Sequence, residues 1–391
     1  MLRVCGDVAV AEECVQAAYE AGLKNWKTQI PDNTGAWIRK TARNRFIDMT
    51  RAHKTHSQAH STLKVANNDN DMLGEGEEPS ILDDELSLMF LCCHPAISST
   101  DQVILVLRLI GGLKPIEIGS AFQTHEDAIR SRLLRAKRKI TAAKISTTMP
   151  PSEDIANRTQ QVLAAIYLIY NEGYRASRDA TTERQDLVLE AIRLAARFCR
   201  YMPEFAEAHG LMALILLNEA RRPARFSNGA LIPLEAQDRT LWDNDLINAG
   251  LMHVQKANGL NTAQQSKSGI YLMQADIAAL HSTIDDFEHT NWTEISNFYD
   301  QILTLQPSSM FELNRIAAAS YQESATQSQK ALDLWEENHQ TSAQSQALRA
   351  DIYRRNNQPQ KAKTSYQSAI ALETDEGIVR FLQNRINRLD A

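Results

Sequence analysis

The sequence predicts an all-α protein with three parts: a short helical domain, a helix-turn-helix domain and a C-terminal array of helical repeats. Long stretches are built from Ala, Leu, Glu, Gln, Lys and Arg, which favour helices, whereas the 391 residues include only 15 Gly and 11 Pro. Apolar residues recur every three or four positions, which is the spacing of one helix face. Near the C-terminus two similar segments lie about two repeat lengths apart.

The N-terminal stretch MLRVCGDVAVAEEC has no apolar core of the length found in signal peptides. No later window approaches the roughly 18 apolar residues that a membrane-spanning helix needs. We therefore expect a cytoplasmic protein without a membrane partner.

The cysteines are odd in number and show no CxxC spacing, so we expect free thiols. They are Cys5, Cys14, Cys92, Cys93 and Cys199. In the stretch LCCHPA, Cys92 and Cys93 stand beside His94. Adjacent helical side chains point about 100° apart, so the two sulfurs cannot readily share a metal. We predict that this pair packs in a core, with a redox or metal role as the alternative; no cofactor or metal is expected.

The formal net charge of −6 conceals an uneven distribution. Residues 1–145 carry 19 basic and 18 acidic side chains, and the rest of the chain carries 23 and 30. Residues 37–54 hold six bases and one acid, residues 69–85 hold eight acids and no base, and residues 130–139 hold six bases and no acid. Two basic segments joined by an acidic connector are therefore the first pattern that points to a nucleic-acid partner.

The first basic segment, AWIRKTARNRFIDMTRAHK, predicts an amphipathic helix. Its apolar face contains Ile38, Ala42, Phe46 and Met49. Lys40, Arg43 and Arg51 fall on the opposite face, and Asn44 lies at its edge. This face can contact nucleic acid, but a basic face that is only solvated is the alternative.

The second basic segment predicts a helix-turn-helix. A short helix over 115–122 and a turn at 123–125 precede a longer helix whose apolar face holds Ile129, Leu133, Ala136 and Ile140. Arg135 and Ser131 point away from that face, with Arg130 and Arg132 beside them. Arginines placed in this way on a second helix can reach phosphates or guanine edges in the major groove. An ordinary helical hairpin is the alternative.

From about Arg158 onward the pattern predicts successive helices, interrupted mainly by residues 220–243. FYDQILTLQP and SYQSAIALET match in register, with Tyr299 and Tyr366 separated by 67 residues, close to two repeats of roughly 34. Such repeats present a concave surface to a partner, although a merely stabilising extension is the alternative. Residues 238–242 are a candidate docking loop, or are held shut by a buried Asp238–Arg239 pair. No nucleophile–base set or phosphate loop occurs, so we expect no enzyme.

Together these motifs resemble an extracytoplasmic-function (ECF) RNA polymerase sigma factor of the sigma-70 family. GAWIRKTARNRFIDMTRAHK resembles sigma region 2, and HEDAIRSRLLRAKRKI resembles region 4. DDELSLMFLCCHPAISSTDQVILVLRLIGGL, IYLIYNEGYRAS and RADIYRRNNQPQKAKTSYQSAIAL resemble the subgroup with a long C-terminal tetratricopeptide-like (TPR-like) extension. The implied domains are region 2 over 1–56, an acidic flexible linker over 57–82, region 4 over 83–146 and the extension over 158–391.

The resemblance implies a promoter-recognition subunit that binds core RNA polymerase and promoter DNA. Contact with the β′ clamp helices is implied for Glu13, Gln16 and Tyr19, and contact with the β flap for the first helices of region 4. The residues implied at the −10 element are Lys40, Arg43, Asn44 and Arg51. Those implied at the −35 element are Arg130, Ser131, Arg132 and Arg135. Residues 26–35 would form the loop that captures a flipped base.

Two further implications concern the ends of the chain. Family members usually begin with another helix, so we expect either that region 2 is short at its N-terminus here or that the true start lies upstream of Met1. The extension is expected to regulate activity through a regulatory protein or an intramolecular contact.

Two other functions fit parts of the sequence. A helix-turn-helix regulator would bind duplex DNA without polymerase and would not need the region-2 helices. A repeat scaffold with a decayed sigma part would bind neither polymerase nor DNA.

Overall fold

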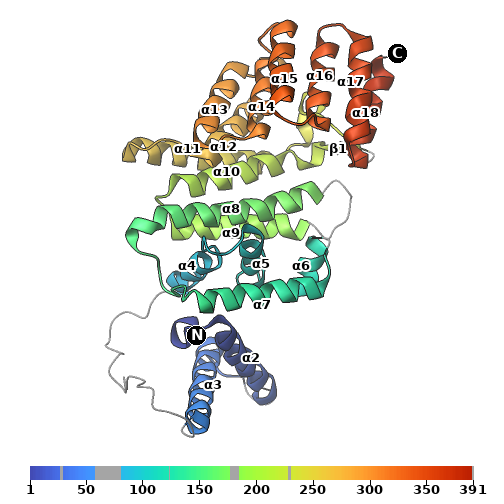
Figure 1. The fold of residues 1–391 in the computed structure, drawn as a ribbon. Helices are drawn as coiled ribbons and strands as arrows, with labels where there is room; N and C mark the ends of the chain where they lie inside the picture. Colours follow the sequence, from blue (N-terminus) through green and yellow to red (C-terminus); the bar gives the residue numbers. More distant parts are fainter. Residues whose placement is uncertain (27–29, 58–80, 123, 177–184, 228–229, 390–391) are drawn as a thin grey trace. The chain divides into compact units, whose positions relative to one another are not determined.

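The computed structural model describes the chain except for residues 27–29, 58–80, 123, 177–184, 228–229 and 390–391; the side chains of residues 3, 51–57, 81–83, 175–176 and 230 also lie outside the description. The described residues form helices and one short hairpin, so the predicted all-α class is confirmed (Figure 1). They divide into two compact units, residues 1–168 and 169–391. Most of the predicted linker over 57–82 lies outside the described residues. No described helix is both long and apolar enough to cross a bilayer.

Unit 1 begins with a pair of packed helices, preceded by one short turn of helix. These elements are α1 (Leu2–Cys5), α2 (Val8–Asn25) and α3 (Thr34–Ser57). Asp7 caps α2, because its carboxylate accepts hydrogen bonds from the backbone N–H groups of residues 9 and 10. Cys14 and Ala18 of α2 are buried against Ala42 of α3. Ile38, Phe46 and Met49 pack on the same cluster, so the predicted apolar face of this basic helix is confirmed.

The rest of unit 1 contains α4 (Ile81–Cys92), α5 (Ser99–Leu109), α6 (Pro115–Ala121), α7 (Glu126–Ala142) and the first part of α8 (Ser152–Ala176). Cys92 and Cys93 at the end of α4 are fully buried, which confirms the packing interpretation of LCCHPA. Burial raises the pKa of the Cys93 thiol to about 12, so this thiol is protonated and inert at neutral pH. Arg158 of α8 donates to the carbonyl of Phe90 at 2.6 Å and so ties α8 to α4.

Helices α6 and α7 pack on each other, and a backbone hydrogen bond joins α6 to the residues that precede α7. The backbone N–H of Thr124 donates to the carbonyl of Gly119 at 2.8 Å. A Cβ atom on Gly119 would lie only 2.7 Å from the Thr124 carbonyl oxygen, so the turn requires glycine at this position. The predicted apolar face of α7 is buried, which confirms this part of the sequence analysis; it consists of Ile129, Leu133, Ala136 and Ile140.

Unit 2 is built around α10 (Ala206–Ala220), whose residues are buried on nearly every side. Around it lie α9 (Gln185–Tyr201), α11 (Asn244–Gln264) and α12 (Ile270–Ser282). The buried carboxylate of Glu207 on α10 accepts hydrogen bonds at 3.0 Å from the first backbone N–H groups of α12, those of Tyr271 and Leu272. Burial raises the pKa of Glu207, and the hydrogen bonds from the start of α12, the positive end of its dipole, partly oppose that rise. Glu207 therefore fixes α12 on α10.

Six further helices form three antiparallel pairs (Figure 1). They are α13 (Trp292–Leu305), α14 (Ser309–Ala319), α15 (Ala325–Asn338), α16 (Ala343–Arg355), α17 (Pro359–Leu372) and α18 (Glu376–Leu389). The first helices of the pairs begin at residues 292, 325 and 359, spacings of 33 and 34 residues. The eighth positions of these helices, Tyr299, Leu332 and Tyr366, all pack in the repeat cores. The predicted repeat region is therefore confirmed.

Residues 221–242 connect α10 to α11, and the described ones, 221–227 and 230–242, have little regular structure. The path contains η3 (Arg222–Ala224), the hairpin β1 (Phe226–Ser227) and β2 (Ala230–Leu231), η4 (Leu234–Ala236) and η5 (Arg239–Leu241). The expected buried Asp238–Arg239 pair is wrong. Asp238 is exposed and accepts a hydrogen bond from the N–H of Thr240, whereas Arg239 donates to two backbone carbonyls and stacks on Trp242.

Candidate nucleic-acid interface

The outer face of α2 carries the residues expected to contact polymerase. Glu13, Gln16 and Tyr19 are all exposed, on the side opposite the buried Cys14 and Ala18. The Tyr19 side chain is 51 % exposed, and Leu23, one turn further along α2, is 75 % exposed. Exposed aromatic and aliphatic side chains flanked by polar groups are typical of a protein-binding surface. This face can therefore contact a protein without disturbing the α2–α3 core.

The outer face of α3 is cationic and free to bind an anion. Lys40, Arg43 and Asn44 are exposed, and among the described side chains neither Lys40 nor Arg43 has an ion-pair partner. A cation without a neutralising carboxylate is available to a phosphate group. Arg51, the fourth residue predicted for this set, lies in α3, but its side chain is outside the described residues.

The loop predicted to capture a base is described only in part, because residues 27–29 lie outside the description. At its start, Trp26 packs edge-on against Trp37 of α3, with ring centroids 5.2 Å apart. At its end, the side chain of Asn33 accepts a hydrogen bond from the N–H of Ala36 at 2.9 Å and begins α3. Both ends of the loop are thus held on the α2–α3 pair.

The predicted −35 residues of α7 fall into different environments. Arg130, Ser131 and Arg135 are exposed. Arg130 is held by Glu126 one turn earlier, with 2.9 Å between Nε and Oε1. Arg132 is half-buried and its Nε lies 3.2 Å from a carboxylate oxygen of Asp101 on α5. Within the described part of the chain, Arg135 is thus the predicted arginine that has no ion pair, and we expect it to be the most available to DNA.

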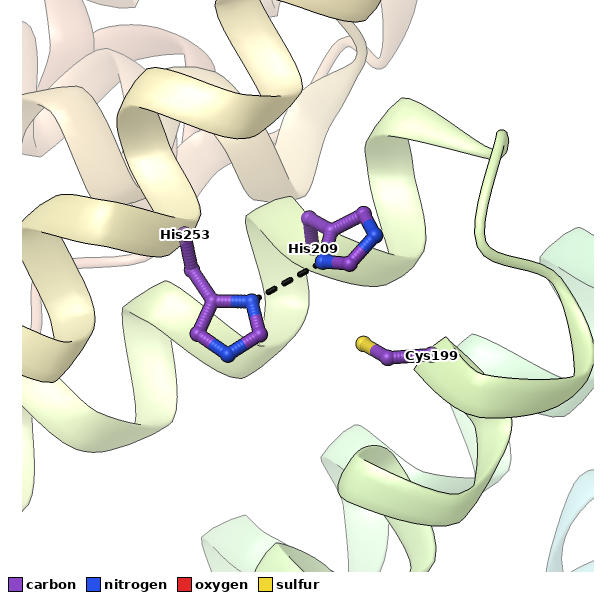
Figure 2. Close-up of side chains that lie close together, drawn as sticks. All are labelled: Cys199, His209 and His253. Atoms are coloured by element: carbon purple, nitrogen blue, oxygen red, sulfur yellow. Dashed lines mark hydrogen bonds between the residues drawn. The ribbon is translucent and has the colours of Figure 1, made fainter.

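The structure also assembles a cluster that the sequence analysis missed. Cys199 of α9, His209 of α10 and His253 of α11 converge, with one potential ligand atom from each within 4.8 Å of the others (Figure 2). These residues are 10 and 44 positions apart and lie on three helices. No spacing of the kind used by zinc-binding motifs joins them, so the sequence carried no signal that could have revealed the cluster.

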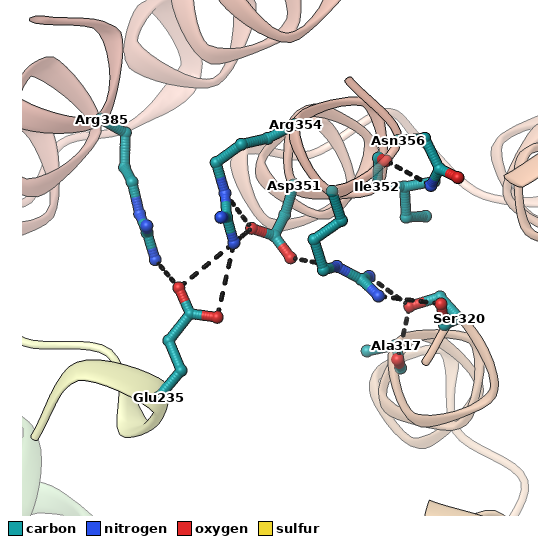
Figure 3. A network of polar contacts seen from close by, with 9 residues as sticks. Glu235, Ala317, Ser320, Asp351, Ile352, Arg354, Asn356 and Arg385 are labelled. Carbon is teal, nitrogen blue, oxygen red and sulfur yellow. Dashed lines mark hydrogen bonds and ion pairs between the residues drawn. The ribbon is translucent and has the colours of Figure 1, made fainter. Parts of the chain in front are cut away.

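A second feature absent from the sequence analysis lies inside the repeat array. Glu235 of η4 reaches the guanidinium groups of Arg354 on α16 and Arg385 on α18 (Figure 3). Arg354 also donates to Asp351 at 2.6 Å, and Asp351 accepts a further hydrogen bond from Arg355 at 3.0 Å. Residues 221–242 therefore touch the repeats through a partly buried network of charges.

This network borders a cavity of about 320 Å³. Its lining is largely aromatic and aliphatic, with Glu235, Asp351 and Arg385 as the charged groups. Trp292 and Tyr321 stack in its wall, with ring centroids 4.0 Å apart. An apolar cavity with a few convergent charges is the usual form of a ligand or peptide site.

Comparison with known proteins gives one full-length relative and one partial relative. The chain is 34 % identical over 396 residues to the uncharacterized protein R00370 of Rhizobium meliloti strain 1021, and the match covers 100 % of this chain and 92 % of that protein. It is 27 % identical over 154 residues to the probable ECF RNA polymerase sigma factor SigI of Mycobacterium tuberculosis, in strains CDC 1551 and H37Rv. That match covers 39 % of this chain and 52 % of SigI. Residues 158–258 match a family model described as a family of unknown function, DUF6596.

Proposed function

We propose that the chain, which belongs to the family of protein R00370, is a sigma factor that binds core RNA polymerase and directs promoter-specific transcription initiation. The role is proposed to be non-enzymatic. Partial similarity to the probable sigma factor SigI supports a sigma-like relationship. The observation that carries the proposal is the pair of basic helices, α3 and α7, each of which buries an apolar face and exposes cations.

In this proposal the two basic helices make different contacts. Lys40, Arg43, Asn44 and Arg51 of α3 track the single strand at the −10 element, where affinity comes mainly from phosphate neutralisation. Helix α7 enters the major groove at the −35 element, where Arg135 reads a base edge or a phosphate. Arg130 and Ser131 lie beside it on the exposed face. Arg132 must leave or share Asp101 before it can reach DNA.

The outer face of α2 is the proposed contact with the β′ clamp helices, through Glu13, Gln16 and Tyr19. The α4 and α5 helices are the proposed contact with the β flap. The extension is proposed to regulate these activities, either by binding a regulatory protein or through an intramolecular contact. Its cavity and charged network provide a surface of suitable chemistry for that role.

The proposal is tested first by binding of the full chain to purified core RNA polymerase, because that measurement needs no promoter sequence. We expect a tight complex, and we expect the double change Gln16→Ala and Tyr19→Ala to weaken it at least tenfold. Lys267→Ala is the matched control, since Lys267 is an exposed cation of unit 2. Promoter DNA selected from a random pool by the reconstituted holoenzyme then serves for the DNA measurements.

On that DNA, Arg135→Ala should weaken promoter binding by roughly 5- to 150-fold, the range of about 1–3 kcal/mol for a base contact, while core binding stays unchanged. Lys40→Ala with Arg43→Ala should lower the slope of log affinity against log salt by about 1.4, which is about 0.7 for each phosphate contact on a single strand. Loss of core binding in Arg135→Ala would contradict the assigned roles. Tight binding to duplex without core would identify a helix-turn-helix regulator, and binding to neither would identify a scaffold.

A further inference from the structure

Three side chains with metal-binding chemistry converge between α9, α10 and α11 (Figure 2). Nδ1 of His209 lies 2.9 Å from Nδ1 of His253, and the two rings are stacked with centroids 5.1 Å apart. The Cys199 sulfur points into the same space, and its thiol donates to the Ala208 carbonyl at 3.3 Å. Cys199 and His209 are buried, whereas His253 is half-buried.

The second nitrogen of His209 fixes which of its atoms faces the cluster. Nε2 of His209 lies 3.0 Å from the carbonyl oxygen of Pro203, which has no proton, so Nε2 must carry the hydrogen and donate it. Nδ1 of His209 is then an unprotonated lone pair. Metal-binding histidines are usually oriented in this way, by a hydrogen bond from the other ring nitrogen to a carbonyl or carboxylate.

We propose that Cys199, His209 and His253 form a binding site for a divalent cation of the zinc class, with Sγ and the two Nδ1 atoms as ligands and a fourth position open to solvent. The cation takes the place of the proton that the two Nδ1 atoms share. Zinc bonds of about 2.0–2.1 Å to nitrogen and about 2.3 Å to sulfur place tetrahedral ligand atoms roughly 3.3–3.6 Å apart. The observed cluster needs only small side-chain movements to reach these distances.

The protonation states before binding make the proton balance simple. Burial lowers the pKa of His209, and burial together with His209 and Lys256 lowers the pKa of His253 to about 4, so both rings are neutral at pH 7. Burial raises the pKa of Cys199 to about 12, so the sulfur enters as a thiol. Binding therefore releases one proton from Sγ, and the ring proton of His253 moves from Nδ1 to Nε2.

The choice of metal follows from the donor set and its neighbours. One thiolate and two imidazoles suit zinc, whereas magnesium and calcium require oxygen ligands. The positive charge of Lys256, on α11, lowers the pKa of all three ligands. This charge favours the Cys199 thiolate but repels a bound cation. The half-exposed side of His253 gives the ion a path from solvent. A bound ion would add metal–ligand bonds to the packing and the hydrogen bonds that hold these three helices together.

The test uses Co²⁺ and Zn²⁺ with the metal-free, reduced full chain. We expect one Co²⁺ per chain, with a sulfur-to-cobalt charge-transfer band and the intense visible bands of tetrahedral coordination, and we expect Zn²⁺ to displace it. Cys199→Ser should abolish the charge-transfer band, and His253→Gln should weaken Zn²⁺ binding at least tenfold. His289→Gln is the matched control, because His289 is an exposed histidine of the same unit.

Circular dichroism and thermal unfolding establish that each variant is folded. X-ray absorption at the zinc edge of the unaltered chain needs no variant, and it should show one sulfur and two imidazole nitrogens around the ion. The proposal is overturned if no ion binds at micromolar concentrations. It is also overturned if the ion has no sulfur ligand, or if Cys199→Ser and His253→Gln bind Zn²⁺ as His289→Gln does. Core polymerase is absent from this test, so its outcome does not depend on the sigma proposal.

Discussion

Replacement of Glu235 by Gln tests how firmly residues 221–242 are held in the repeat array. Glutamine has nearly the same shape, so the change removes the charge and leaves the packing. Arg385 loses the carboxylate that it contacts, whereas Arg354 keeps its hydrogen bonds to Asp351. The effect of the change is therefore concentrated on Arg385, whose side chain is 13 % exposed.

The magnitude follows from this burial. Fully exposed ion pairs contribute about 0–1 kcal/mol, and removal of one partner from a buried pair costs about 3–5 kcal/mol. The Glu235 side chain is 22 % exposed, which places the network between these limits. We expect Glu235→Gln to lower the free energy of unfolding of unit 2 by about 2 kcal/mol. For a unit of this size, that corresponds to a fall in Tm of roughly 4–8 °C.

The assay is scanning calorimetry of the full chain, combined with limited proteolysis at residues 221–242. Glu376→Gln is the matched control, because the Arg380–Glu376 pair also joins Arg to Glu but is 55 % and 88 % exposed. The control should change the stability by no more than about 0.5 kcal/mol. Faster cleavage between η3 and η5 should accompany the lower Tm of Glu235→Gln. Equal stability of the two variants would refute the argument that this network holds the segment.

Three other measurements follow from the structure. Gly119→Ala should destabilise unit 1 by more than 1 kcal/mol in urea unfolding, because its Cβ would meet the Thr124 carbonyl. Gly259→Ala lies on open helix surface and should stabilise unit 2 by up to about 1 kcal/mol. Stability changes of the same sign in both variants would contradict this steric argument. Burial lowers the pKa of His281 to about 3, so the neutral ring stabilises the fold above pH 6.5, and that stability falls as the pH drops toward 3. In the unaltered chain the urea midpoint of unfolding should fall between pH 7 and 4.5, and it should fall less in His281→Gln. An equal fall in both proteins would refute the role of His281. The Cys93 thiol should react with Ellman's reagent only after unfolding; rapid reaction of the native chain would disprove its burial.

The features that the sequence predicted well are those set by local periodicity. The apolar faces of α3 and α7 depend on helix geometry alone, and their positions were confirmed by burial. The repeats were detectable because Tyr299 and Tyr366 keep equivalent positions in α13 and α17. In α15 the equivalent position is Leu332, which fills the same place in its core without the tyrosine that made the others recognisable.

The features that the sequence did not predict depend on contacts between distant segments. Helical periodicity placed Arg132 and Arg135 together beside the exposed face of α7, but it could not show that Asp101 on α5 pairs with Arg132. The contact between Glu235 and Arg385 joins residues 150 positions apart. Such pairs are fixed by the packing of whole helices, and one sequence carries no direct record of them. The DNA and polymerase contacts of the site residues stay predictions.

The sequence analysis missed the Cys199–His209–His253 cluster and the Glu235 network, and both contribute to holding residues 221–242 in place. Residues 221–242 connect α10 to α11, and the proposed metal site joins these two helices through His209 and His253. The ends of the stretch are thus fixed by the α10–α11 packing, and its tip is fixed by Glu235 on α16 and α18. Loss of the Glu235 contacts should loosen the stretch around η4, where the packing of β2 on α18 remains, while buried Ala224 and Trp242 hold its two ends. Under the proposed regulatory role, this stretch is therefore the part of the extension best suited to exchange places with a partner that presents a carboxylate to Arg385.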